Sequence, residues 1–139
     1  MKWTVDKIVE WHQMAMPNAT IDQQTTKVED ELHELNTAAS LYIEEAGPQG
    51  EALEELADVY ISSVVLAKRF NSSIGVVVYN FIMDSIDRLA EQGTEGAIRL
   101  LSKIYKAIDE KMDKNVHREW EEISPGYYQH KETENDRIH

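Results

Sequence analysis

Two pairs of acidic side chains at helical spacing place the strongest constraint on the fold of this chain. Glu31 and Glu34 form the first pair, and Glu55 and Asp58 form the second. Residues three apart lie on one face of a helix, so each pair presents its carboxylates together. The break at Gly47-Pro48 between the pairs ends one helix and begins another. We therefore expect two antiparallel neighbouring helices that direct four carboxylates into one space.

Four carboxylates in one space favour a metal site. Oxygen ligands alone suit Mg²⁺, with Mn²⁺ as a substitute, and without a cation the carboxylates would repel one another strongly in a low dielectric. The alternative is an ordinary solvated helix face, because Glu is a good helix former. Asp58 favours the metal site, since no charged residue occurs between it and Lys68 and it therefore lies at the margin of a buried stretch.

The hydrophobic pattern predicts an all-α fold, an antiparallel helical bundle of about five helices. A length of 139 residues favours one domain, expected over residues 1–123, followed by a polar C-terminal tail over residues 124–139. The first three helices are expected at about 4–15, 20–45 and 49–70, with a capping box at Thr20-x-x-Gln23 and a fifth helix capped by Thr94.

The fourth segment is ambiguous, because the β-branched run Ile74–Met83 also suits a buried strand. We predict a helix there. A lone strand would have no partner, and the apolar residues continue at helical spacing through Ile86 and Leu89 until Gln92-Gly93. This run and the pair Val64-Val65 supply more apolar surface than one short bundle needs, so we expect a homodimer or homotetramer.

Composition excludes several classes of partner. A net charge of −12 argues against nucleic acid, since affinity for its backbone comes from Lys and Arg. The N-terminal residues show no signal peptide, and the longest uncharged stretch is too short and polar for a membrane span. The absence of cysteine rules out disulfides and thiolate zinc sites and fits a reducing cytosol, so a cytoplasmic protein is expected.

A stripe of polar and basic residues near the end of the fifth helix suggests phosphate binding. Lys111, Asn115 and Arg118 follow one another at i, i+4 and i+7, with Lys114 beside them. The alternative is that cations simply favour a helix C-terminus. In so acidic a chain a local stripe with a bidentate arginine favours a phosphate clamp. Four aromatic residues offer stacking on a base, with core packing as the alternative: Trp3, Trp11, Tyr60 and Trp120.

One histidine suggests a different kind of metal site. Asp30-x-x-His33 has the carboxylate-x-x-His spacing of di-iron bundles. The second helix offers Glu55-x-x-Asp58 without a histidine, so half of the di-iron signature is missing. A surface or packed histidine is the alternative for His33.

Together these motifs resemble the MazG-like all-α nucleoside triphosphate pyrophosphatases, a superfamily that includes the dCTP pyrophosphatase branch. The resemblance spans about residues 20–120 and rests on Lys27-x-x-x-Glu31-x-x-Glu34, Glu55-x-x-Asp58 and Lys111-Met112-x-x-Asn115-x-x-Arg118. It implies a helical bundle, Mg²⁺ dependence, and dimers or tetramers with sites near subunit contacts. It also implies metal ligands at Glu31, Glu34, Glu55 and Asp58, and substrate contacts at Lys27, Lys111, Asn115 and Arg118. Asp30 departs from the pattern, since many members have Glu at that position.

We therefore expect a Mg²⁺-dependent enzyme that hydrolyses a nucleoside triphosphate to the monophosphate and pyrophosphate. Glu34 is the expected base that orients or deprotonates the attacking water, while Glu31, Glu55 and Asp58 bind the metal. Two alternatives stay open, a non-catalytic oligomeric helical adaptor and a carboxylate-bridged di-iron bundle. The sequence leaves open the preferred base and sugar, the number of metal ions and the role of the tail.

Overall fold

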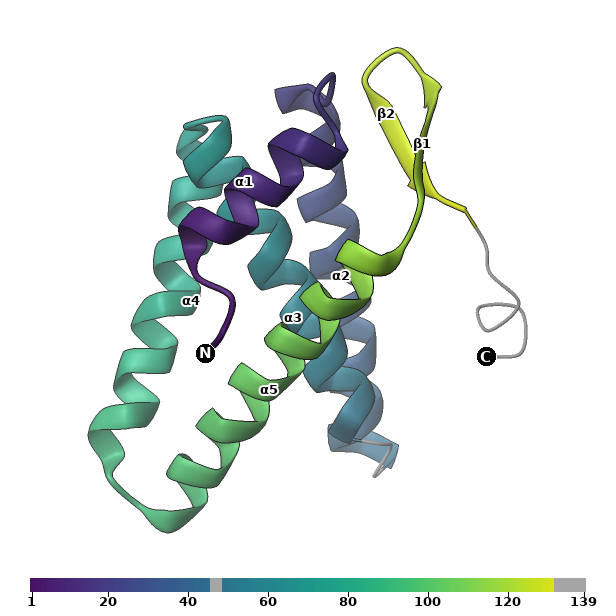
Figure 1. The fold of residues 1–139 in the computed structure, drawn as a ribbon. Coiled ribbons are helices and arrows are strands. Elements are labelled where there is room, and N and C mark those ends of the chain that lie inside the picture. Colours follow the sequence, from purple (N-terminus) through teal and green to yellow (C-terminus); the bar gives the residue numbers. More distant parts are fainter. Residues whose placement is uncertain (46–48, 132–139) are drawn as a thin grey trace.

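Helices make up most of the described structure, a computed structural model that describes residues 1–45 and 49–131. Figure 1 shows long helices packed along one another, with a small hairpin at one end. The described elements are α1 (Val5–Ala15), α2 (Ile21–Glu45), α3 (Gln49–Val64), the π-helical turn η1 (Val65–Arg69), α4 (Ser73–Gln92), α5 (Glu95–His117), β1 (Trp120–Ser124) and β2 (Tyr127–His130). The expected helical class and the five α-helices are confirmed, while the Gly47-Pro48 break lies outside the described residues.

Threonine hydroxyls cap the N-termini of α2 and α5, as the sequence predicts. Thr94 accepts a hydrogen bond from the backbone N–H of Ala97 at 3.2 Å and so caps α5. At α2 half of the capping box forms, since the N–H of Gln23 donates to Thr20 Oγ1 at 3.3 Å. The side-chain amide of Gln23 instead donates to the carbonyl of Pro125 at 3.2 Å. The start of α2 is thereby joined to the hairpin.

The ambiguous run Ile74–Met83 is helical and belongs to α4, which ends at Gly93 with a left-handed φ of 64°. The core lies between α3 and its neighbours. Val64 and Val65, counted as surplus apolar surface in the sequence, are 0% and 1% exposed and belong to this core. The other buried members of the core are Ile8, Ala57, Val59, Tyr60, Ile61, Ile82, Ile86, Ile104, Ile108 and Met112.

The third helix differs from the prediction at its C-terminal end. The α-helix expected to reach Phe70 changes at Val65 into a wider turn, in which the N–H of Phe70 donates to the carbonyl of Val65 at 3.3 Å. Asn71 then takes a left-handed φ of 51°, and α4 turns back against η1. Gly75 of α4 lies directly on the backbone of Leu66 and Ala67.

The hairpin differs from the prediction of a polar tail from residue 124 onward. Trp120 pairs with His130 and Glu122 pairs with Tyr128 in antiparallel register. Two such short strands are marginal alone, and contacts with the joint between α1 and α2 stabilise them. The backbone N–H of Asn18 donates to the Tyr128 hydroxyl at 3.1 Å, and its side-chain amide donates to Glu122 at 3.2 Å. Residues 132–139 of the expected tail lie outside the described residues.

Within the described residues, no helix combines the length and the apolar character needed to cross a membrane.

The close approach at Gly75 predicts a specific loss of stability. A Cβ added there would lie 2.7 Å from Ala67 N and from Leu66 C, which are backbone atoms that cannot turn aside. Gly75→Ala should therefore lower the free energy of unfolding by about 1 to 3 kcal/mol in urea titrations. Gly96→Ala is the matched control, because a Cβ there meets nothing within 4 Å, and it should be neutral or stabilising. Equal effects of the two substitutions would contradict the packing described here.

Candidate metal centre and adjoining cavity

Antiparallel packing of α2 against α3 brings three of the four predicted metal ligands together. The two helices lie side by side (Figure 1). Glu31 and Glu34 of α2 and Glu55 of α3 each offer one carboxylate oxygen, and these three atoms lie within 4.8 Å of one another. Such a spacing lets one cation contact all three oxygens. This group of three carboxylates is called the carboxylate cluster below.

Asp58 lies beside the cluster and has a basic partner. Its Oδ1 is 3.4 Å from the ammonium of Lys111, and both side chains are largely buried, at 18% and 13% exposed. The same ammonium lies 3.4 Å from Glu54 Oε1. Asp58 therefore pairs with Lys111 and is not part of the group formed by the three glutamates, and its predicted role as a metal ligand stays a prediction.

Burial and repulsion raise the pKa of two members of the carboxylate cluster, Glu31 and Glu55. Burial, followed by the charge of Asp58, raises the pKa of Glu31 to about 8. The same two causes raise the pKa of Glu55 to about 7. Burial also raises the pKa of Asp58, although the Lys111 ammonium acts against the shift. Glu31 and Glu55 would therefore release protons when a cation binds at neutral pH.

Two carboxylate oxygens in the cluster lack a hydrogen-bond partner. Glu31 Oε2 and Glu55 Oε2 are buried, and no described residue donates a hydrogen bond to either of them. Buried polar atoms are almost always paired in folded proteins. An acceptor oxygen left in this state beside other carboxylates fits a bound cation, and protonation serves the same purpose in its absence.

A cavity of about 320 Å³ adjoins the cluster, within the usual size range of ligand sites. Its lining contains Glu31 and Asp58 and every residue predicted to contact substrate, namely Lys27, Lys111, Asn115 and Arg118. Thus the structure brings the predicted basic stripe and the acidic residues to one space. Glu34 and Glu55 belong to the carboxylate cluster but do not line this cavity.

Of the four aromatic candidates, Trp11 and Trp120 line the cavity. Their rings lie 5.9 Å apart with an interplanar angle of 67°. The ammonium of Lys27 lies 5.8 Å from the centre of the Trp120 ring. Trp120 is fixed by a hydrogen bond from its indole N–H to the carbonyl of Asn115 at 3.0 Å. A planar ligand entering the cavity would meet these indole rings.

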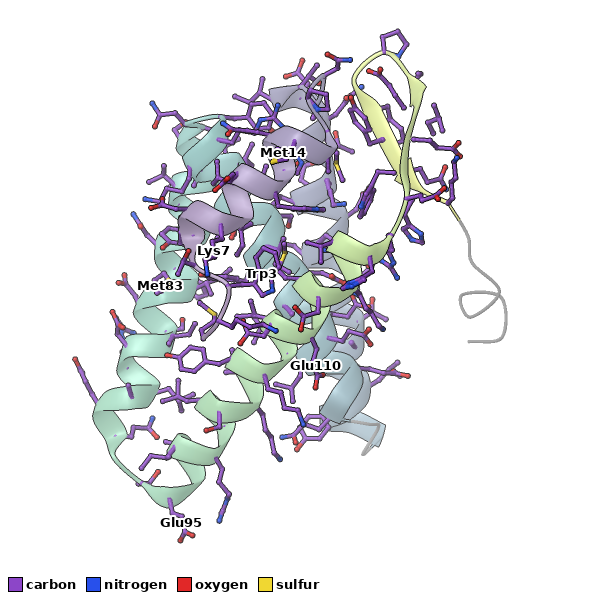
Figure 2. All side chains as sticks on the ribbon, in the orientation of Figure 1. Trp3, Lys7, Met14, Met83, Glu95 and Glu110 are labelled. Atoms are coloured by element: carbon purple, nitrogen blue, oxygen red, sulfur yellow. The ribbon has the colours of Figure 1, made fainter. Side chains whose placement is uncertain are left out.

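The other two aromatic candidates have structural roles. Tyr60 is 2% exposed and belongs to the core. Trp3 lies against α5 (Figure 2), where its indole N–H donates to Asp113 at 3.0 Å. For these two residues the alternative of packing is the correct one.

Sequence reasoning missed several cavity residues, among them His12, Gln24, Ser62 and Tyr128. Gln24 precedes Glu31 by seven residues, so its helical spacing offered a signal. His12 and Tyr128 come from α1 and from the hairpin, and nothing in their local sequence indicates the cavity. Tertiary packing alone brings them there.

The di-iron alternative gains no support from His33. This residue is exposed on α2 and is no part of the carboxylate cluster. The expectation of a surface histidine is confirmed.

Comparison of the chain with known protein families, with curated proteins and with solved structures gave no match. The resemblance to the MazG-like superfamily accordingly remains an expectation from the quoted motifs.

The raised pKa values predict how the stability of the metal-free protein depends on pH. An unfolded glutamate titrates near 4.5, whereas Glu31 and Glu55 titrate near 8 and 7 in the folded protein. Between these values the folded state binds more protons than the unfolded state, so the free energy of unfolding must fall as pH rises from 4.5 to 8. Thermal unfolding in the presence of a chelator measures this decline.

Glu31→Gln should flatten the decline and raise the melting temperature at pH 8, because it removes one of the repelling charges. Glu29→Gln, an exposed site on the same helix, is the control and should leave the pH dependence unchanged. A decline of wild-type slope in Glu31→Gln would show that this carboxyl is not perturbed.

Proposed function

We propose that this protein is a Mg²⁺-dependent nucleoside triphosphate pyrophosphohydrolase, which converts a nucleoside triphosphate to the monophosphate and pyrophosphate. One observation carries the proposal. The carboxylate cluster, with two unpartnered buried oxygens, opens beside a cavity that also presents lysines and indole rings. Carboxylates suit a cation, lysines suit phosphate, and indole rings suit a base.

The residues present fit a magnesium ion. Glu31, Glu34 and Glu55 would hold it, with Asp58 reached through a water or after exchange of its lysine partner. Bound there, Mg²⁺ would neutralise phosphate oxygens and lower the pKa of a water. Mn²⁺ prefers the same ligands and could replace it.

The side chains of the chain have separate roles in the proposed reaction. Glu34, the exposed member of the cluster, would accept a proton from the attacking water. The water oxygen bonds to the α-phosphorus, the bond from that phosphorus to the bridging oxygen breaks, and pyrophosphate leaves. Lys111 and Arg118 would stabilise the charge on the leaving group, and Lys27 would neutralise phosphate from the side of α2.

Pyrophosphate release from a panel of canonical and modified nucleoside triphosphates, with and without Mg²⁺, tests the proposal directly. Mg²⁺-dependent release from at least one nucleotide is expected. Absence of release and of Mg²⁺ binding would instead favour the non-catalytic adaptor.

Substitutions in the carboxylate cluster and at the neighbouring Asp58 should separate chemistry from folding. Glu55→Gln and Asp58→Asn each remove a negative charge with little change in shape, so turnover should be lost while the circular dichroism spectrum of the helices is kept. Magnesium binding should weaken in both variants, more strongly for Glu55→Gln, since Lys111 already neutralises Asp58. Near wild-type pyrophosphate release in both variants would refute the metal assignment.

The basic residues should act on substrate and not on the metal. Lys111→Ala and Arg118→Ala are expected to lower kcat/KM by about 10- to 1000-fold, the range for a lost charge-assisted contact in a transition state. Magnesium binding should not weaken in Lys111→Ala, because the substitution removes a cation from Asp58.

Lys114→Ala is the matched control for these two variants. Its side chain is 60% exposed, pairs with Glu54 at 3.6 Å, and does not line the cavity. A small and equal loss of kcat/KM at Lys111, Arg118 and Lys114 would mean that these basic residues only interact with the helix dipole and do not bind phosphate.

A homodimer or homotetramer also remains a proposal, supported by apolar side chains on the outer face of α4. Val77 and Phe81 are 68% and 73% exposed, and Ile74 is 55% exposed. A second copy that covers this face would remove these side chains from water. Sedimentation of the wild type should show an oligomer at micromolar concentration, and Phe81→Asp should shift it toward monomer. A fully active wild-type monomer would exclude the assembly.

A further inference from the structure

Three buried polar side chains that are not part of the carboxylate cluster line the cavity. His12 is 4% exposed, Gln24 is 5% exposed and Asn115 is 8% exposed. Polar groups so deeply buried normally satisfy all of their strong hydrogen-bonding atoms within the protein. Among the described residues, the hydrogen bonds of the His12 ring and of the Gln24 amide each involve only one of the two polar atoms of the group.

The contact of Gln24 fixes which way its amide points. The amide nitrogen donates to the backbone carbonyl of Ser62 at 3.0 Å. The carbonyl oxygen of the same amide receives no hydrogen bond from any residue in the described parts of the chain. Gln24 therefore offers the cavity a hydrogen-bond acceptor.

The contact of His12 fixes its tautomer. Its Nδ1 lies 2.6 Å from a guanidinium nitrogen of Arg69, and a guanidinium can only donate. Nδ1 must therefore accept, so the ring proton is on Nε2. Burial, followed by the charge of Arg69, lowers the pKa of His12 to about 3, which keeps the ring neutral at physiological pH. Nothing in residues 1–45 and 49–131 accepts a hydrogen bond from Nε2–H.

The distance between the two ends of the cavity suits a nucleotide. Gln24 and Glu31 are seven positions apart in α2, which corresponds to about 10 Å along the helix axis. Helix α3 runs antiparallel beside α2, so that its Ser62 contacts Gln24 and its Asp58 lies near Glu31. A nucleoside triphosphate whose phosphates lie at the cluster would extend its base toward Gln24, His12 and the two indole rings.

We propose that the acceptor oxygen of Gln24 and the Nε2–H of His12, two residues that line the same cavity, bind the edge of a nucleobase, with Trp11 and Trp120 as the walls of this base subsite. The inference rests on the proposed function and adds the residues that select the base. An exocyclic amino group or ring N–H of the base donates to Gln24, and a ring nitrogen or carbonyl accepts from His12. A ligand without such an edge would leave these atoms of Gln24 and His12 buried and unpaired, and its affinity would be lower.

His12→Asn is the most selective test. The asparagine oxygen can take the place of Nδ1 as the acceptor for Arg69, whereas the donor toward the cavity is lost. Gln24→Met removes the acceptor in a side chain of similar length. Each should lower kcat/KM for the preferred nucleotide by about 10-fold and reduce discrimination between bases. Gln13→Met, on the exposed face of α1, is the matched control and should have no effect.

Inorganic tripolyphosphate, which has no base, separates this role from a structural one. Its Mg²⁺-dependent affinity, measured by calorimetry, should be the same in the wild type, His12→Asn and Gln24→Met. If tripolyphosphate binding fell as much as nucleotide binding, the two residues would support the fold only and the proposal would be overturned. Unchanged kcat/KM across the nucleotide panel in both variants would overturn it as well.

Nucleosides without phosphate distinguish failure of the subsite from failure of the proposed function. They should quench the tryptophan fluorescence of the wild type, and His12→Asn should weaken this binding. If no nucleotide is hydrolysed but nucleosides still bind through His12, the base subsite stands and the enzymatic proposal fails. If nucleotides are hydrolysed but nucleosides bind equally to wild type and variant, the enzyme stands and the subsite fails. If neither occurs, both fail.

Discussion

Repulsion between carboxylates that the fold forces together is the constraint on which the rest of the site depends. The packing of α2 on α3 buries apolar side chains such as Val28 and Ala57, and the same packing places three carboxylate oxygens within 4.8 Å of one another. Hydrophobic burial stabilises the helix pair, whereas the charges at its polar edge destabilise it. Raised pKa values at Glu31 and Glu55 are the direct expression of this conflict. Either protons or a cation must resolve it.

The remaining elements position the side chains around the carboxylate cluster and the cavity. Helix α5 places the Lys111 ammonium between Asp58 and Glu54, which neutralises the charges on one side of the cluster. The hairpin after α5 brings Trp120 over the cavity and is itself joined to the start of α2 through Gln23 and Pro125. The turn η1 presents Arg69, whose guanidinium donates to the carbonyls of Met16 and Pro17 and to His12. Among these residues, those that line the cavity are Asp58, Lys111, Trp120, Met16 and His12.

The parts that sequence predicts well are those encoded locally. Helical spacing and local signals predicted α1 nearly to the residue, as well as the end of α4 and the start of α5, because caps such as Thr94 and stops such as Gly93 act over one turn. The same spacing placed Glu31, Glu34 and Glu55 on facing sides of two neighbours. Asp58 illustrates the limit, since its lysine partner is 53 positions away in the chain and belongs to another helix. The hairpin escaped prediction because its stability comes from Asn18 and Gln23, which precede it by about 100 residues.

Calorimetric titration of Mg²⁺ into the metal-free protein at pH 7, in two buffers that differ in their heat of ionisation, tests the central claim most directly. At this pH Glu31, with a pKa of about 8, is mostly protonated and Glu55, with a pKa of about 7, is about half protonated, and a cation bound to their oxygens must displace these protons. The account predicts binding accompanied by proton release, seen as a heat that depends on the buffer. Absence of binding, or binding without proton release, would contradict the claim that the carboxylate cluster is a metal centre.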